Sequence, residues 1–165
     1  MMQKATKANE NVYYQARIRA AAYNDLLSSR EGASNIVCIE RTRLANIELG
    51  NINPHPEEVN LMTNSYNAPE LQNYYCSQQC PLGCGRVDRL TPRSLEGAAL
   101  KIGRVTRDIG NIVDVISDIA EDGRITAEER PLFDRSMEQL IALKNSIEEL
   151  MLVSDKSNKN NEQDE

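Results

Sequence analysis

The stretch that decides the fold of this 165-residue chain is residues 29–54, which read SREGASNIVCIERTRLANIELGNINP. Ser28 and Ser29 are favourable N-caps for a short helix that runs to Val37, because a serine hydroxyl can accept a backbone N–H of the first turn. A second short helix is predicted over about 41–49 and ends at Gly50, since glycine readily adopts the left-handed conformation that closes helices. The stretch therefore predicts two short helices with a tight turn between them.

Further short helices surround this pair. The preceding segment carries one apolar stripe at three- and four-residue spacing, made by Tyr13, Ala16, Ala20, Tyr23 and Leu27. Two following helices are predicted over about 56–66, where Val59, Met62 and Tyr66 would be buried, and over about 69–75. No segment alternates apolar and polar residues as a half-buried strand does. The first half of the chain is therefore expected to form an all-α domain of five helices.

The second half of the chain carries a longer repeat, with apolar residues at alternating three- and four-residue spacing: Ile102, Val105, Ile109, Ile112, Ile116 and Ile119. Thr126 and Glu129 form a capping box that opens a further helix, whose apolar face would be Phe133, Met137, Leu140, Leu143, Ile147 and Leu150. Two helices of ~25 residues joined by a tight turn predict a long antiparallel hairpin. Several apolar residues lie off both stripes, which suggests packing on a second copy or a partner: Val113, Val115, Leu132, Ile141 and Met151.

We therefore expect an all-α protein with five parts. They are a flexible N-terminus (1–11), a five-helix domain (12–75), a cysteine-bearing linker (76–92), a helical hairpin for oligomerisation or partner docking (93–154) and a disordered acidic tail (155–165).

The charge of the chain is unevenly distributed. The formal net charge is −6, yet residues 1–50 hold seven Lys and Arg against five Asp and Glu, while residues 101–165 hold nine against fifteen. This balance excludes broad, charge-driven coating of nucleic acid but leaves room for a small DNA-reading surface in the first part of the chain. No apolar run approaches a membrane span and no secretory leader is visible, so a cytoplasmic protein without membrane contact is expected.

Residues 29–54 have the pattern of a helix-turn-helix and resemble the Cro/repressor-type (XRE family) transcriptional regulators. The matching positions are Ser29, Ser34, Val37, Ile39, Leu44, Ile47, Glu48, Gly50 and Pro54, and the resemblance extends over about 12–75. It implies a repressor-like domain whose second motif helix enters the DNA major groove, and a homodimer that reads two half-sites.

The candidate DNA-binding residues follow from this placement. The base-reading candidates, exposed at the start of the second motif helix, are Arg41, Thr42, Arg43 and Asn46. Arginine can bond guanine and asparagine can bond adenine through two hydrogen bonds each. Arg30, at the start of the first motif helix, is expected to contact a phosphate.

The resemblance also implies a structural ion pair between Glu48 and either Arg17 or Arg19. Two positions depart from the family pattern. Cys38 stands where the turn usually has glycine, and a left-handed conformation there costs a non-glycine residue ~1 kcal/mol. Glu40 stands where the second helix usually has a serine or threonine cap, so a weaker cap and a negative charge near the phosphates are expected.

These observations predict a sequence-specific DNA-binding transcriptional regulator, with a repressor that binds its operator as a dimer as the leading interpretation. The alternative is a protein-interaction adaptor with a degenerate helix-turn-helix that no longer contacts DNA and a hairpin that docks a protein partner. No enzymatic activity is expected, because the single histidine, His55, leaves a serine or cysteine nucleophile without an evident base.

Three cysteines form a C-x3-C-x3-C pattern: Cys76, Cys80 and Cys84. They could hold zinc or an iron–sulfur cluster with Cys38 or His55 as a fourth ligand, although the spacing is not the C-x2-C of common zinc sites. The alternatives are a set of reduced thiols in a compact loop, which is preferred, and transient disulfides, so no cofactor is expected.

Residues 118–129 match much of the template of a calcium-binding loop. Ala120 removes one oxygen ligand, and the same residues are explained by Gly123 ending one helix and by Thr126 capping the next. Capping is therefore the preferred interpretation.

Overall fold

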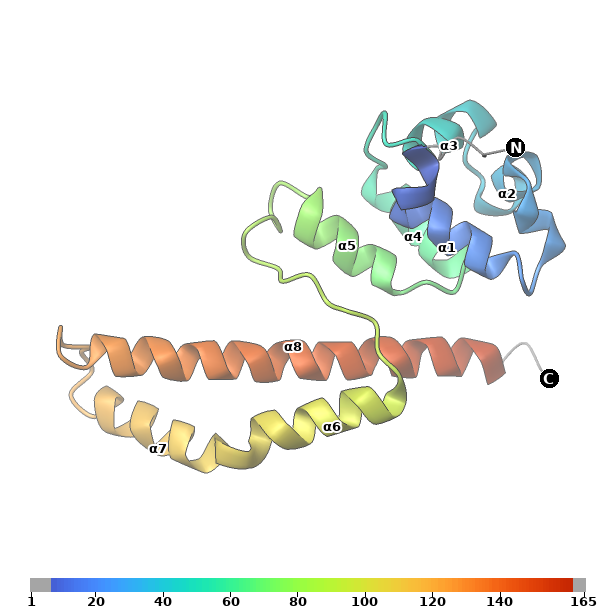
Figure 1. Cartoon of the computed structure of the whole chain (residues 1–165). Coiled ribbons are helices and arrows are strands. Elements are labelled where there is room, and N and C mark those ends of the chain that lie inside the picture. Colours follow the sequence, from blue (N-terminus) through green and yellow to red (C-terminus); the bar gives the residue numbers. More distant parts are fainter. Residues whose placement is uncertain (1–6, 162–165) are drawn as a thin grey trace. The chain divides into compact units, whose positions relative to one another are not determined.

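The computed structural model describes the backbone of residues 7–161 and the side chains of residues 8–156 (Figure 1). Within these residues all regular secondary structure is helical, which confirms the all-α class. The chain divides into two compact units. The first comprises residues up to Arg89 with the chain end from Lys156, and the second comprises Leu90–Asp155.

The first unit contains five α-helices in its described residues: α1 Val12–Ala20, α2 Arg30–Val37, α3 Arg41–Glu48, α4 Pro56–Ser65 and α5 Glu70–Gln78. Two 3-10 turns, η1 (Lys7–Glu10) and η2 (Asp25–Ser28), precede α1 and α2. The predicted cap of α2 is confirmed, because Ser29 accepts a hydrogen bond from the Gly32 N–H at 3.0 Å. Gly32 also packs against η2, where an added Cβ would lie 2.1 Å from the carbonyl oxygen of Leu26.

The start of the chain is more ordered than the sequence suggests. Ala8 is buried in η1, and Asn11 caps α1 by accepting the Tyr13 and Tyr14 N–H groups. The Asn11 amide also donates to the carbonyl of Ile47 at 2.9 Å. The predicted flexible N-terminus is therefore wrong for residues 7–11, and residues 1–6 lie outside the described part of the chain.

The apolar stripe predicted for the first helix is interrupted. Helix α1 ends at Ala20, and the backbone turns before η2 brings Leu27 into the core. Tyr23 lies in this turn and is 92% exposed, so its predicted place in the stripe is wrong. Tyr23 fits the three- and four-residue spacing of the stripe, but α1 ends three residues before Tyr23, so the two do not share a helix face.

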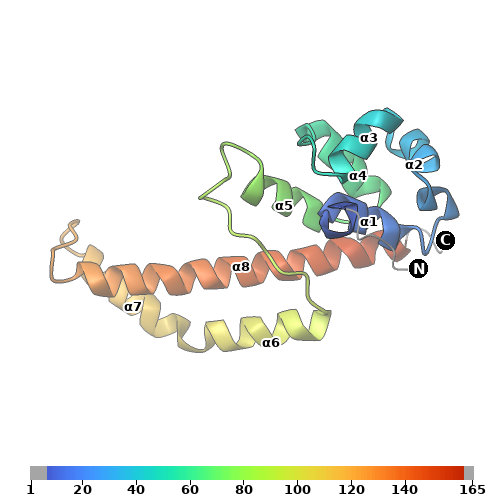
Figure 2. The same cartoon turned by 45° about the horizontal axis from the view of Figure 1, so that its top comes forward.

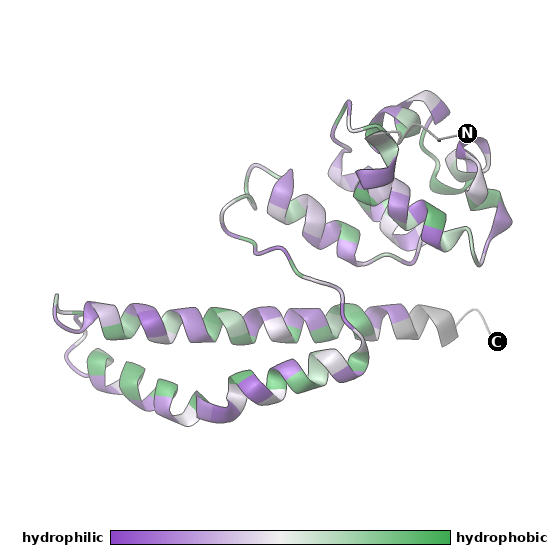
Figure 3. Cartoon of the chain, in the orientation of Figure 1, coloured by the Kyte–Doolittle hydropathy of each residue, from purple (hydrophilic) through white to green (hydrophobic). Residues whose placement is uncertain are grey.

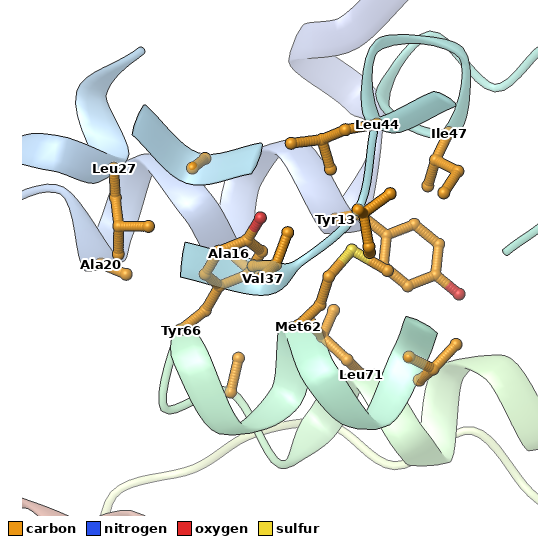
Figure 4. Packing of buried hydrophobic residues seen from close by; sticks show 14 residues of the cluster. Tyr13, Ala16, Ala20, Leu27, Val37, Leu44, Ile47, Met62, Tyr66 and Leu71 are labelled. Carbon is orange, nitrogen blue, oxygen red and sulfur yellow. The ribbon is translucent and has the colours of Figure 1, made fainter. Parts of the chain in front are cut away.

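A single hydrophobic cluster holds the first unit together (Figure 4). Tyr13 of α1, Leu44 of α3 and Met62 of α4 are at most 1% exposed, and the Tyr13 hydroxyl donates to Gln79 at 2.7 Å. The predicted burial is confirmed for Val59 and Met62 of α4 and for Tyr66, which follows its last residue. The two motif helices are thereby fixed to one shared core.

The second unit contains α6 (Leu95–Val105), the 3-10 turn η3 (Thr106–Asp108), α7 (Ile109–Ala120) and α8 (Arg130–Asn161) as far as Asp155. Figures 1 and 2 both show α8 running alongside α6 and α7. The first predicted hairpin helix is thus broken in two at η3, and the second is longer than predicted. Residues up to 161 belong to α8, so the predicted disordered tail is wrong for 155–161, while 162–165 lie outside the described residues.

The predicted inner face of α8 is also partly wrong. Met137 and Ile147 are 37% and 45% exposed, whereas Ser136, Ser146 and Glu149 are buried. The Ser146 hydroxyl donates to the carbonyl of Ala142 at 2.7 Å, so this small polar residue can face inward without an unsatisfied hydrogen bond. Apolar and polar residues alternate closely along α6, α7 and α8 (Figure 3), and spacing alone did not show which stripe faces inward.

Candidate nucleic-acid interface

The turn between α2 and α3 is built on a left-handed residue. Cys38 has φ 53° and ψ 36°, as the comparison with glycine at this position predicted. The Ser34 hydroxyl donates to the carbonyl of Ile39 at 2.7 Å, and the Ile39 side chain is buried. The turn is therefore fixed by a hydrogen bond from α2 and by the buried side chain of Ile39, and these local contacts set the angle between the two helices.

Helix α3 presents two different faces. Leu44 and Ile47 are at most 1% exposed and belong to the core. Arg41 and Thr42, in the first turn, are exposed. The amphipathic pattern thus places the N-terminal turn of α3 at the surface while the rest of the helix is anchored.

Glu48 is the buried centre of an ion-pair cluster. Its carboxylate accepts hydrogen bonds from Arg17 Nε at 2.5 Å and from Arg17 Nη2 at 3.1 Å, and Arg17 also donates to the carbonyl of Leu27 at 2.7 Å. Of the two arginines named for this pair, Arg17 makes it, and Arg19 instead pairs with Glu70 at 2.8 Å. The cluster ties α1, η2 and α3 together beneath the motif.

Arg30 joins the same cluster. Its Nε donates to Glu48 Oε2 at 2.7 Å, and its side chain is 33% exposed. The residue expected to contact a phosphate is therefore engaged inside the protein, although its side chain is not fully buried. This contact was not predicted, because neither helix periodicity nor the family resemblance links Arg30 to Glu48.

Arg43 is likewise paired, with Glu58 in the first turn of α4. Arg43 Nε contacts Glu58 Oε1, and Arg43 Nη2 donates to Glu58 Oε2 at 2.8 Å. The hydrogen bond from Arg43 holds the pKa of Glu58 below its usual value, although partial burial acts in the opposite direction. Glu58 also accepts the His55 backbone N–H at 2.7 Å, so its carboxylate is fixed from two sides.

Glu40 caps α3, contrary to the expected weakening of that cap. Its carboxylate accepts the Arg43 N–H at 2.9 Å. Hydrogen bonds from the backbone N–H groups of Thr42 and Arg43 lower the pKa of Glu40, so the side chain is ionised at neutral pH. The cap is thus supplied by a carboxylate, whose negative charge favours a helix N-terminus but stands at the edge of the candidate interface.

The remaining candidate residues differ in how far their side chains are engaged in hydrogen bonds or ion pairs within the protein. Asn46 accepts a hydrogen bond from the Asn51 amide at 3.1 Å. Thr42 donates toward Glu40. Arg41 makes no ion pair among the described residues, so its guanidinium is the candidate group most available to a ligand.

The cysteine pattern is divided between a helix and a loop. Cys76 lies in α5, which ends at Gln78, and Cys80 and Cys84 follow it in the loop. All four cysteines of the chain are free thiols. Among the residues that the structure describes, no three His, Cys, Asp or Glu side chains are grouped as metal ligands.

The segment that resembles a calcium loop uses its polar groups internally. Asp122 accepts the Arg124 N–H at 2.9 Å, and Glu129 accepts hydrogen bonds from the Thr126 N–H and hydroxyl. The reciprocal bond from the Glu129 N–H to Thr126 completes the predicted capping box.

Between residues 7 and 161, no helix combines the length and the apolar character that crossing a bilayer requires. No protein-family model matches this chain, and searches of curated proteins and of solved structures found no significant match.

Proposed function

We propose that this protein is a sequence-specific DNA-binding transcriptional regulator that reads double-stranded DNA with α3. The observation that carries the proposal is the first turn of α3. It exposes Arg41 and Thr42, while Leu44 and the buried carboxylate of Glu48 anchor the same helix. A short, rigidly held helix with an exposed polar first turn, preceded by a tight turn and a second helix, is the geometry used for major-groove reading.

The charges around α3 indicate what kind of binding to expect. Arg30 and Arg43 are engaged with Glu48 and Glu58, and Glu40 adds a negative charge. Few arginines are therefore free to neutralise phosphates, and non-specific affinity and its salt dependence should be small. Discrimination between sequences must then come from a small number of base contacts.

The second unit carries a surface that can pair two such domains. Large apolar side chains are exposed on α6, α7 and α8, among them Leu100, Val113, Ile141 and Met151. We propose that this surface forms a homodimer, which would place two α3 helices on two half-sites of an operator. Light scattering tests this point: Ile141→Lys should yield monomers, whereas Gln139→Lys, an exposed polar position with the same change in charge, should not.

The decisive experiment is selection of bound sequences from a random pool of double-stranded DNA by the full chain. A motif with two related half-sites is expected. Arg41→Ala should lose about tenfold or more in affinity for that motif, by loss of a base contact. Arg107→Ala removes the same charge from an exposed position in η3 and should leave affinity unchanged. If the unmodified chain selects no motif, the proposal fails.

The ion pairs of Arg30 and Arg43 favour one second candidate, a protein-interaction adaptor. In that case the arginines of the motif serve the stability of the domain, and the exposed apolar surface of the second unit docks a different protein. An adaptor predicts no selected DNA motif and unchanged stability on Arg41→Ala, so the same selection separates the two functions.

A further inference from the structure

The pair between Arg43 and Glu58 uses only part of each side chain. Arg43 meets the carboxylate side-on, through Nε and one hydrogen of Nη2. Arg43 Nη1 has no hydrogen bond to the described residues, and the side chain is 34% exposed. The outer edge of the guanidinium, formed by Nη1 and the second hydrogen of Nη2, therefore remains unused.

That outer edge has the shape needed for one particular base. A guanidinium carries five N–H groups in a rigid planar fork, so a carboxylate on the Nε side leaves two parallel donors at the opposite end. Guanine presents two adjacent acceptors, O6 and N7, in the major groove, and a bidentate arginine is its commonest specific contact. Adenine offers one acceptor and one donor at the same place and cannot accept both hydrogen bonds.

We propose that Glu58 is a positioning residue that holds Arg43 in the orientation in which it reads a guanine. This inference rests on the proposed DNA-binding function and extends it to a base and to a residue outside α3. The ion pair, which at first sight removes Arg43 from the interface, fixes its long side chain before DNA arrives. The cost of ordering a flexible arginine on binding is thereby reduced.

Glu58 is itself well placed to act in this way. Its side chain is only 13% exposed, and it accepts the His55 N–H at 2.7 Å in the first turn of α4. The carboxylate therefore cannot follow Arg43 outward, so it defines the position of the guanidinium plane. Arg41, by contrast, has no such partner among the described residues.

A purely structural role for the pair, tying α3 to α4, makes different predictions. It would affect stability and overall DNA affinity, but not the preference for one base over another at one position. The test is therefore a measurement of base preference. Each base pair of the sequence selected by the unmodified full chain is replaced in turn, and relative affinities are measured for each protein variant.

The expected result is that Arg43→Ala loses the preference for guanine at one position by roughly ten- to a hundredfold. Arg43→Lys, which keeps the charge beside Glu58, should lose most of the same preference. Glu58→Gln should weaken preference at that position alone, and Arg107→Ala should change nothing. Thermal unfolding followed by circular dichroism checks that each variant is folded.

The exchanged variant, Arg43→Glu with Glu58→Arg, separates the two roles most sharply, because it restores an ion pair between α3 and α4 without an arginine on α3. Guanine preference should stay lost in it. If the exchange restores the original preference, or if Arg43→Lys and Glu58→Gln lower affinity equally for all bases, the inference is wrong while the DNA-binding function stands. If the unmodified chain shows no sequence preference, both are wrong.

Discussion

The two units of this protein bury their apolar residues very differently. In the first unit, side chains from α1 to α5 converge on one cluster, and Leu44, Val37 and Met62 are completely buried. Among the residues of α6–α8 whose side chains the structure describes, Ile112 and Ile119 are the only large apolar ones that are buried, while α8 turns Ser136, Ser146 and Glu149 inward. The stability of the first unit is therefore internal, whereas the second leaves apolar surface that a partner can cover.

The largest expected effect comes from the buried carboxylate of the first unit. Glu48→Ala leaves Arg17 buried without its partner and should lower the free energy of unfolding by about 4 kcal/mol, as measured by urea denaturation. Glu148→Ala is the matched control in the second unit, where the carboxylate forms an exposed pair with Lys144 at 3.9 Å. A loss below about 1 kcal/mol is expected there, and equal losses in the two variants would remove the contrast.

The cores can be compared in the same way. Leu44→Ala creates a cavity in a closely packed cluster and should cost about 3 kcal/mol of unfolding free energy. Ile141→Ala, at a side chain that is 43% exposed, should cost under about 1 kcal/mol at low protein concentration. At concentrations where a dimer forms, the cost of Ile141→Ala should rise. A cost independent of concentration would argue against a partner surface at Ile141.

Acid should affect the second unit through Glu149. Burial alone would raise the pKa of this carboxyl, but hydrogen bonds from Lys101 and Arg93 lower it overall. A lowered pKa means that its stabilisation is complete above the unfolded value of about 4.5 and is lost as the pH falls through the folded value. Urea denaturation at pH 7 and pH 3.5 should show that the unmodified chain loses up to about 1.4 kcal/mol more of its unfolding free energy over this range than Glu149→Gln does, because pH 3.5 lies only about one unit below the unfolded pKa. An unchanged dependence would contradict this role.

The smallest expected effect is a gain in stability, on replacement of Cys38 by glycine. Cys38 has a positive φ of 53°, which glycine adopts without the steric cost that a side chain carries. Cys38→Gly should therefore raise the free energy of unfolding of the first unit by about 1 kcal/mol, measured by denaturation under reducing conditions. Cys84→Gly, at an exposed thiol without positive φ, should bring no gain.

Local features of the first unit could be predicted from the sequence because they depend on neighbouring residues. The Ser29 cap follows from the residue type at the start of the helix, whereas the left-handed turn at Cys38 was implied by the resemblance to a family that has glycine there. The pairs of Arg30 with Glu48 and of Arg43 with Glu58 were not predicted, because neither helix periodicity nor the family resemblance links these residues. These long-range contacts decide which arginines of the motif are free, so they matter most for the proposed interface.

The buried face of α8 in the second unit was predicted wrongly for a different reason. Helices with apolar residues on more than one side have several stripes of similar spacing, and Met137 and Ile147 fit one of them. The structure buries Ser136 and Ser146 instead. Small side chains permit a close approach between helices, and a prediction based only on the spacing of apolar residues does not take this into account.

The length of α3 sets a limit on how this protein can be divided. Its eight residues rise only about 12 Å along the helix axis, and an isolated helix of fewer than about 12–15 residues is barely populated in water. Helix formation in α3 therefore depends on the rest of the first unit. A synthetic peptide that copies this helix should be a poor mimic of the protein, and any loss of tertiary structure should remove the whole reading surface at once, without a partly active intermediate.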